Sequence, residues 1–171
     1  NSLANLGDLT TAATDAITIT VNDADDAALT AANLSSLGGK TAGTVTVTNA
    51  VAITGDHDQV TAALVTAGTK VVVDDATVTI NDADGVAITA AELSAIGGST
   101  TGTVTVTNAV AITGDHDQVT AALITSGTKV EVSDAAVTIN DADATAITAL
   151  ELSTIGEATT GDVTVTNAVA I

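Results

Sequence analysis

Short runs in which Val or Ile alternates with a polar residue recur along this chain and predict β-strands. In one such run Val104 and Val106 alternate with Thr, and this two-residue period indicates a strand with one buried face. Asn108–Ala109 interrupts the alternation, and asparagine tolerates turn geometry. We therefore expect a bend there, followed by a second short strand that contains Val110 and Ile112.

An acidic loop and an apolar stripe at helical spacing follow this strand pair. Asp115 or Asp117 is expected to cap a short helix, because a carboxylate there accepts hydrogen bonds from free backbone N–H groups. Gly127 is expected to end that helix. The stripe that predicts the helix consists of Val119, Leu123 and Ile124.

The same order of predicted elements recurs with a different sequence over residues 130–156. A bend at Asp134–Ala135 separates two predicted strands, and Asn140–Asp143 takes the place of the first acidic loop. Gly156 is expected to end a second short helix. The strand signals are Val130, Val132, Val137 and Ile139. The helical stripe is Ile147, Leu150 or Leu152, and Ile155.

Together the two halves form a unit that repeats at a fixed interval, since Thr44–Leu64 recurs letter for letter as Thr103–Leu123. Fixed-period self-similarity predicts stacked units, each burying its neighbour's open face. We expect an α/β repeat solenoid with parallel strands and two strand-bend-strand-helix coils in each repeat. It would be one continuous solenoid over 1–171, made of a diverged repeat 1–43, repeats 44–102 and 103–161, and a partial repeat 162–171.

This layout, a short apolar strand and an Asn turn before a helix, resembles the leucine-rich-repeat coil. The resemblance covers the layout only, because the LxxLxLxxN signature is absent and VTVTNAVAI keeps a loose echo of it. It implies parallel strands joined by helical crossovers. The alternative is an array of small β-sandwiches of the cadherin or bacterial immunoglobulin-like type. A 59-residue repeat is short for such a sandwich, and the helical stripes would be unexplained.

The composition narrows the classes of protein. Hydrophobic residues make up 46% of the chain, but aromatics, Met, Cys and Pro are absent, so Val, Ile, Leu and Ala must form the core. The net charge of −18 argues against nucleic acid and against anionic membrane surfaces, and no apolar run is long enough to insert into a membrane. The chain lacks an initiator Met and stops at Ile171 inside a recurring NAVAI segment, so we expect both ends to be cut from a longer array.

The acidic loops are the candidate metal sites, because carboxylates in D-x-D spacing offer the hard oxygen ligands that calcium prefers. The candidate calcium ligands are Asp56, Asp58, Asp82, Asp84, Asp115, Asp117, Asp141 and Asp143. The alternative is that these residues cap helices and keep the surface soluble. Neither loop matches the EF-hand or the G-G-x-G-x-D nonapeptide. His57 and His116 occupy equivalent loops. A single histidine in each repeat is more often a solvated loop residue than a zinc ligand, so we expect both to be solvated.

No nucleophile is paired with a histidine and a carboxylate in a way that predicts an enzyme. Gly38–Gly39 and Gly97–Gly98 are expected to be helix ends and not phosphate loops, since no Lys-Ser/Thr follows them in a P-loop pattern. Thr residues are expected to face outward as a ladder, which resembles the ice-binding face of some β-solenoid antifreeze proteins. The members of this predicted ladder are Thr44, Thr46, Thr48, Thr103, Thr105, Thr107, Thr164 and Thr166.

Repetition and composition over the whole chain resemble the very large secreted repeat proteins of bacteria, namely adhesins, sheath proteins and surface-layer components. The resemblance implies an extracellular or cell-surface structural protein that forms a fibre, sheath or array by coil stacking and head-to-tail association with copies of itself. No cofactor is required in this interpretation, and calcium would be an accessory. A calcium-dependent adhesin and an ice-binding protein are the two alternative functions.

Overall fold

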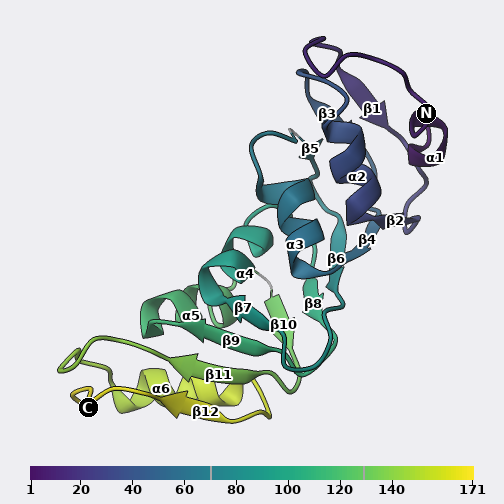
Figure 1. The fold of residues 1–171 in the computed structure, drawn as a ribbon. Helices are drawn as coiled ribbons and strands as arrows, with labels where there is room; N and C mark the ends of the chain where they lie inside the picture. The colour runs from purple at the N-terminus through teal and green to yellow at the C-terminus, as the bar shows by residue number, and fades with distance from the viewer. Residues whose placement is uncertain (70, 129) are drawn as a thin grey trace. The chain divides into compact units, whose positions relative to one another are not determined.

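The computed structural model describes residues 1–69, 71–128 and 130–171. The fold is α/β with parallel strands, as the sequence predicts (Figure 1). The chain divides into two compact units, which are described separately. The first unit consists of residues 1–80 and 99–103, and the second consists of residues 81–98 and 104–171.

In the first unit, short strands pair in two parallel ladders. Strand β3 lies between β1 and β5, and β4 lies between β2 and β6. Helix α2 packs against α3 and the π-helical turn η1, which follow β4 in the chain. The elements are α1 (Leu3–Leu6), β1 (Ile19–Val21), β2 (Ala28–Thr30), α2 (Ala31–Gly38), β3 (Val45–Val47), β4 (Ala52–Gly55), α3 (His57–Val60), the π-helical turn η1 (Thr61–Val65), β5 (Val71–Val72) and β6 (Thr77–Ile80).

The second unit repeats this arrangement. Strand β8 pairs with β10, and β9 lies between β7 and β11, which also pairs with β12. Helix α5 packs between α4 and α6, and the three follow one another beside strands β9 and β11 in Figure 1. The elements are β7 (Ala87–Thr89), α4 (Ala90–Gly97), β8 (Val104–Val106), β9 (Ala111–Gly114), α5 (His116–Leu123), β10 (Val130–Val132), β11 (Ala136–Ile139), α6 (Ala149–Glu157) and β12 (Val163–Val165).

The strands alternate buried and outward positions, as their two-residue period predicts. Ile88, Ile112 and Val137 are Cα partners on neighbouring strands, and each is 0–1% exposed. The buried hydrophobic side chains of the described residues are all Val, Ile, Leu or Ala. The predicted bend at Asn108 is present between β8 and β9. The core of Val, Ile, Leu and Ala that the composition predicts is therefore built from rows of side chains on neighbouring strands.

The helix that follows β9 begins where predicted but ends earlier. Asp115 is its N-cap, and its C-cap is Ile124, so Gly127 lies beyond the helix in a turn. The predicted end was wrong because Thr128 lies against the last turn: its Oγ1 is 2.9–3.0 Å from the carbonyl oxygens of Ala121 and Ala122 in the helix and of Thr125 beyond it, and its hydroxyl can donate to one of them at a time. Within the predicted stripe, Val119 is buried while Leu123 and Ile124 are half-buried, and Ala122 is buried in their place.

The second predicted stripe also needs correction. Ile147 is buried, but it lies before helix α6, next to a parallel bridge between Ala146 and Ala170. Leu150 is 76% exposed, and Gly156 lies inside the helix, which continues to Glu157. The apolar spacing misleads here because a short extended segment, equivalent to β7 in the preceding repeat, comes between the acidic loop and the helix. In contrast, Gly38–Gly39 and Gly97–Gly98 do end α2 and α4.

Candidate functional site

The acidic loops before α3 and α5 act as helix caps. The Oδ1 atoms of Asp56 and Asp115 each accept a hydrogen bond of 2.8 Å, from the backbone N–H groups of Gln59 and Gln118 respectively. These bonds satisfy N–H groups that have no partner inside the helix. The second carboxylates of these loops, Asp58 and Asp117, are exposed.

The loop after β11 makes a contact across the second unit. Asp141 is 5% exposed, and its Oδ2 accepts the backbone N–H of His116 at 2.8 Å. Its Oδ1 lies 2.7 Å from Nδ1 of the same histidine. His116 is the first residue of α5, so one buried carboxylate holds both the main chain and the side chain of the helix start. A carboxylate is favoured there because the helix dipole places positive charge at its N-terminus.

This contact shifts the titration of both groups. The hydrogen bond with Asp141 is the main reason that the pKa of His116 lies above its ordinary value of 6.5, and burial opposes it in part. Burial raises the pKa of Asp141, but the hydrogen bonds from the ring and amide of His116 outweigh burial, and that pKa is lowered from 3.8. The ion pair is therefore favoured when both groups are charged.

Hydrogen bonds between side chains and main-chain atoms join the acidic loops 81–84 and 140–143 to the bends that follow β8 and β12. Within the second unit, Nδ2 of Asn108 donates to the carbonyl of Asp82, and Nδ2 of Asn167 donates to the carbonyl of Asp141. The carboxylate of Asp143 accepts the backbone N–H of Ala168 at 3.1 Å. The predicted ligands in this loop therefore also serve as connectors between neighbouring segments.

The Asp84 carboxylate makes the same connection one repeat earlier, accepting the N–H of Ala109 at 3.2 Å. The residue that follows, Gly85, has a φ of 76° and donates its N–H to the carbonyl of Ala109 at 2.8 Å. Ala144 has the equivalent place in the next repeat, with a φ of 63°. A left-handed backbone conformation is unfavourable for residues with a Cβ, so the positive φ of Ala144 destabilises this loop relative to glycine.

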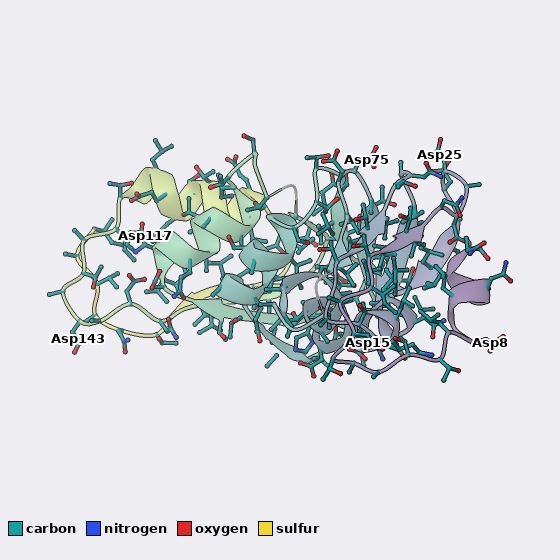
Figure 2. All side chains as sticks on the ribbon, turned by 90° about the horizontal axis from the view of Figure 1, so that it is seen from above. Asp8, Asp15, Asp25, Asp75, Asp117 and Asp143 are labelled. Atoms are coloured by element: carbon teal, nitrogen blue, oxygen red, sulfur yellow. The ribbon has the colours of Figure 1, made fainter. Side chains whose placement is uncertain are left out.

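The described residues contain no group of three or more His, Asp or Glu side chains placed to hold a metal ion. Among the candidate ligands of the second unit, Asp117 and Asp143 are exposed, while Asp141 is buried against His116. Figure 2 labels Asp117 and Asp143 as separate side chains of that unit. The ring of His116 faces carboxylates, with Nε2 3.5 Å from Asp117 Oδ1. Calcium binding by these loops stays a prediction.

The sequence interpretation missed a buried threonine clamp. Oγ1 of Thr159 donates to the carbonyl of Ala135 at 2.7 Å and accepts the N–H of Gly161 at 3.0 Å. The same two bonds occur at Thr41, to Ile17 and Gly43, and at Thr100, to Ala76 and Gly102. The three threonines are 4–8% exposed. A Thr-x-Gly pattern at the repeat spacing is the signal that could have found them.

The glycine of each clamp is required by a close approach of two backbones. A Cβ on Gly43, Gly102 or Gly161 would lie well under 3.0 Å from a backbone carbonyl oxygen of the neighbouring segment. Gly38 and Gly97, the last residues of α2 and α4, approach the backbones of Thr69 and Thr128 equally closely. Glycine is used here because any side chain would separate the neighbouring segments.

Of the members of the predicted Thr ladder, Thr164 alone lies in the uninterrupted Thr row of the second unit. Each of these strands pairs with strands from the other half of a repeat and not with the equivalent strand of the next repeat, so Thr46 pairs with Thr20 and Val72, and Thr105 pairs with Glu131. The predicted rows are therefore interrupted. An uninterrupted outward row does cross the second unit, on strands β7, β9, β11 and β12. Its members are Thr89, Thr113, Thr138 and Thr164.

No family model matches the chain, and neither the curated proteins nor the solved structures contain a match to it. Among the described residues, no helix has the length and apolar character needed to cross a bilayer.

Proposed function

We propose that this chain is a structural repeat protein of an extracellular fibre, sheath or surface array. Its repeats, each made of two strand-helix coils, would stack as an α/β solenoid, and copies would associate head to tail. The observation that supports this function best is the threonine clamp, which appears at Thr41, Thr100 and Thr159 with equivalent partners each time. A contact repeated at a fixed interval serves stacking, whereas catalysis uses one unique constellation.

The clamps and connectors are directed at main-chain atoms. Backbone carbonyls accept from Thr159 and Asn167, and a backbone N–H donates to Asp143. Because these partners do not depend on the side chain of the neighbouring segment, the same devices would work between any two repeats. This supports a stack that extends by addition of similar units and that gains stiffness from each interface.

Strand β12 supports association with further segments of the same kind. Val163 and Val165 are half-buried, whereas the equivalent Val104 and Val106 of β8 are 0% and 2% exposed. Among the described strands, β12 pairs with β11 alone. An open parallel edge with apolar residues is a template for another strand. The net charge of −18 opposes contact between copies, so association should depend on ionic strength.

Negative-stain electron microscopy of the purified chain, with calcium and with chelator, tests the proposal. Filaments or sheets in both conditions are expected for a self-assembling structural protein. Assembly in calcium alone would move the role to the acidic loops and favour the adhesin alternative. Single short particles at all salt and protein concentrations would contradict head-to-tail association.

A matched pair of variants separates specific stacking from aggregation. Val165→Asp places a charge on the open edge of β12 and should abolish filaments. Val72→Asp places the same charge on a valine that is already 51% exposed on β5, and should leave them intact. Equal loss of assembly in both variants would contradict the assignment of β12 as the edge that associates.

Ice binding is the second candidate, and one observation favours it: the in-register row that contains Thr113 and Thr138, beside a parallel row that contains Ala111 and Ala136. Regular hydroxyl and methyl groups on a β-face give a surface with the repeat of the strand spacing. Inhibition of ice recrystallisation is the test. Activity that is lost in Thr113→Leu and Thr138→Leu, with unchanged circular dichroism, would support this function, and an inactive native chain would exclude it.

A further inference from the structure

Helix α6 is exposed on a face that is buried in the equivalent helices α2 and α4. Leu34 in α2 and Leu93 in α4 are 0% exposed, whereas Leu152 at the same place in α6 is half-buried. Ala149 is exposed as well, although its two equivalents are buried. In their own units, α2 packs against α3 and η1, and α4 packs against α5. A helical segment of the same kind would restore the burial of α6.

The end of α6 carries a glycine with open space beside it. Its equivalents Gly38 and Gly97 approach a neighbouring backbone so closely that a Cβ on them would lie well under 3.0 Å from the carbonyl oxygens of Thr69 and Thr128 respectively. Among the described residues, a Cβ on Gly156 would meet no atom within 4 Å. The surface that lacks its cover, called the α6 face below, consists of Ala149, Leu152 and Gly156.

Residues 1–10 match the segment that covers α4. Ala4 in α1 stands two repeats before Ala122 in α5, and Thr10 stands two repeats before Thr128. Ala122 is 0% exposed, whereas Ala4 and Thr10 are exposed. Between them, two main-chain carbonyls accept hydrogen bonds of 2.6 and 3.0 Å from Nζ of Lys40, which follows α2. The segment therefore offers the groups that the α6 face lacks, and it is held to its own unit.

The strands beside these two surfaces fit the same register. Ile112 on β9 and Val137 on β11 are Cα partners. Ile171 stands one repeat after Ile112 and is 79% exposed, and Ile19 on β1 stands two repeats before Val137. Among the described strands, β1 is at the edge of its sheet. The shift that brings the threonine segment to the α6 face therefore also brings Ile19 to Ile171.

We propose that residues 1–19 of a second copy dock on the α6 face, with the second copy's Thr10 beside Gly156 and its Ile19 paired with Ile171. The inference rests on the proposed head-to-tail association and adds the contact residues and the register. Helix α1 of the second copy would pack on α6 as α5 packs on α4, so the interface is heterologous and can repeat. Each contact has a counterpart inside a single unit.

The part of the interface that involves β12 requires a rearrangement. In the same register, residues 12–14 of the second copy would lie beside β12, as β10 lies beside β8. Within one copy these residues form a turn, in which the N–H of Asp15 donates to the carbonyl of Ala12 at 2.9 Å. Docking on the α6 face therefore comes first, and β12 gains its partner when this turn opens.

Acidic side chains on both surfaces oppose the contact. Glu157 is exposed at the end of α6, and Asp8 and Asp15 are exposed in the docking segment. Salt screens the repulsion between exposed charges. Docking should therefore strengthen as the ionic strength rises.

Sedimentation velocity of the full chain at high ionic strength, over a range of protein concentrations, provides the first test. Gly156→Ala adds a Cβ that a single copy accommodates in a helix but that the docked threonine segment would meet. It should lower the association constant by about tenfold or more. Gly127→Ala makes the same change in open space on the turn after α5 and should associate like the native chain. Circular dichroism should be unchanged in both variants.

Cross-linking between two differently substituted chains tests the register. Ala170 stands one repeat after Ala111, and Thr18 stands two repeats before Ala136, the Cα partner of Ala111. Neighbouring strands are close enough for a disulfide. The chain has no cysteine, so a mixture of Ala170→Cys and Thr18→Cys chains can form one kind of mixed disulfide, which should accumulate under oxidation. Thr20→Cys, at the next outward position, should cross-link less with Ala170→Cys.

The outcomes separate the interface from the proposed function. Weaker association in Gly156→Ala alone, together with preferential cross-linking between positions 170 and 18, is the expected result. Filaments that form equally well with Gly156→Ala would overturn this interface and leave the structural function in place. In-register dimers without filaments would support the docking and contradict the fibre. A native chain that stays monomeric at high ionic strength would overturn both.

Discussion

The same contacts appear in the two units at equivalent positions of the repeat. Thr41 and Thr159 clamp backbones in their own units, and Asp23 and Asp141 each hold the first amide of a preceding helix. All of these contacts end on main-chain atoms. The contacts that the repeat preserves are therefore those made to backbone N–H and C=O groups, which a neighbouring segment of any sequence can supply.

The differences between the units lie in side chains that meet other side chains. The helix residue that the carboxylate holds is Leu3 at Asp23 and His116 at Asp141, so the contact at Asp141 includes an ion pair that the side chain of Leu3 cannot form at Asp23. The left-handed loop residue is Asp26 in one and Ala144 in the other. The units should therefore respond alike when a backbone contact is removed, and differently when pH or loop strain is changed.

The largest shared effect should come from Gly43→Ala and Gly161→Ala. Each added Cβ would lie well under 3.0 Å from a carbonyl oxygen, and we expect each unit to lose about 3 kcal/mol of unfolding free energy. Urea unfolding followed by far-ultraviolet circular dichroism measures this, since the chain has no aromatic residue for fluorescence. Gly156→Ala is the control, because it lies in a helix with open space around it and should be neutral or stabilising. A neutral Gly161→Ala would contradict the close approach.

Thr41→Val and Thr159→Val should have the next largest effect. Valine keeps the shape of the side chain but leaves the carbonyl of Ile17 or Ala135 without its clamp, at an expected cost of about 2 kcal/mol. The exposed Thr160, which donates to Ser133, serves as the control, and Thr160→Val should cost about 0.5 kcal/mol. Equal costs at Thr159 and Thr160 would show that burial of the clamp is unimportant.

Asp23→Asn and Asp141→Asn should differ in their cost in unfolding free energy. Both variants keep an oxygen for the helix amide, but the second also loses the ion pair with His116, so in weakly acidic solution it should cost about 1 kcal/mol more. The gap should narrow as the pH rises through the raised pKa of His116. Denaturant titrations at several pH values measure it, and a gap independent of pH would argue against a charged imidazole in the folded state.

The smallest effect should come from the left-handed loop. Ala144→Gly relieves a φ of 63° and is expected to stabilise the second unit by about 0.5 kcal/mol after the greater freedom of glycine in the unfolded chain is counted. Gly85→Ala makes the reverse change at a φ of 76° and should destabilise by about 1 kcal/mol. Thermal unfolding of the pair should shift in opposite directions, and shifts of the same sign would refute the strain.

The features predicted correctly depend on local chemistry. Alternation of Val with Thr predicts β8, and the position of Asp115 before an apolar stripe predicts the start of α5. Features that depend on distant segments were missed or misplaced. The end of α5 is set by Thr128, and the ladder spacing is hidden because the two halves of a repeat use different letters. The partner of Asp141 was out of reach for the same reason, since it lies in the other half of its repeat.

The central claim is that identical contacts stack successive repeats, and insertion of one further copy of residues 103–161 after Gly161 tests it directly. We expect the extended chain to unfold as cooperatively as the original, with a larger dependence on urea and a higher unfolding free energy, because each added interface contributes the same clamps and connectors. Small-angle X-ray scattering should show an increase in length with an unchanged cross-section. A separate unfolding transition for the added copy, with the original transition unchanged, would contradict the account.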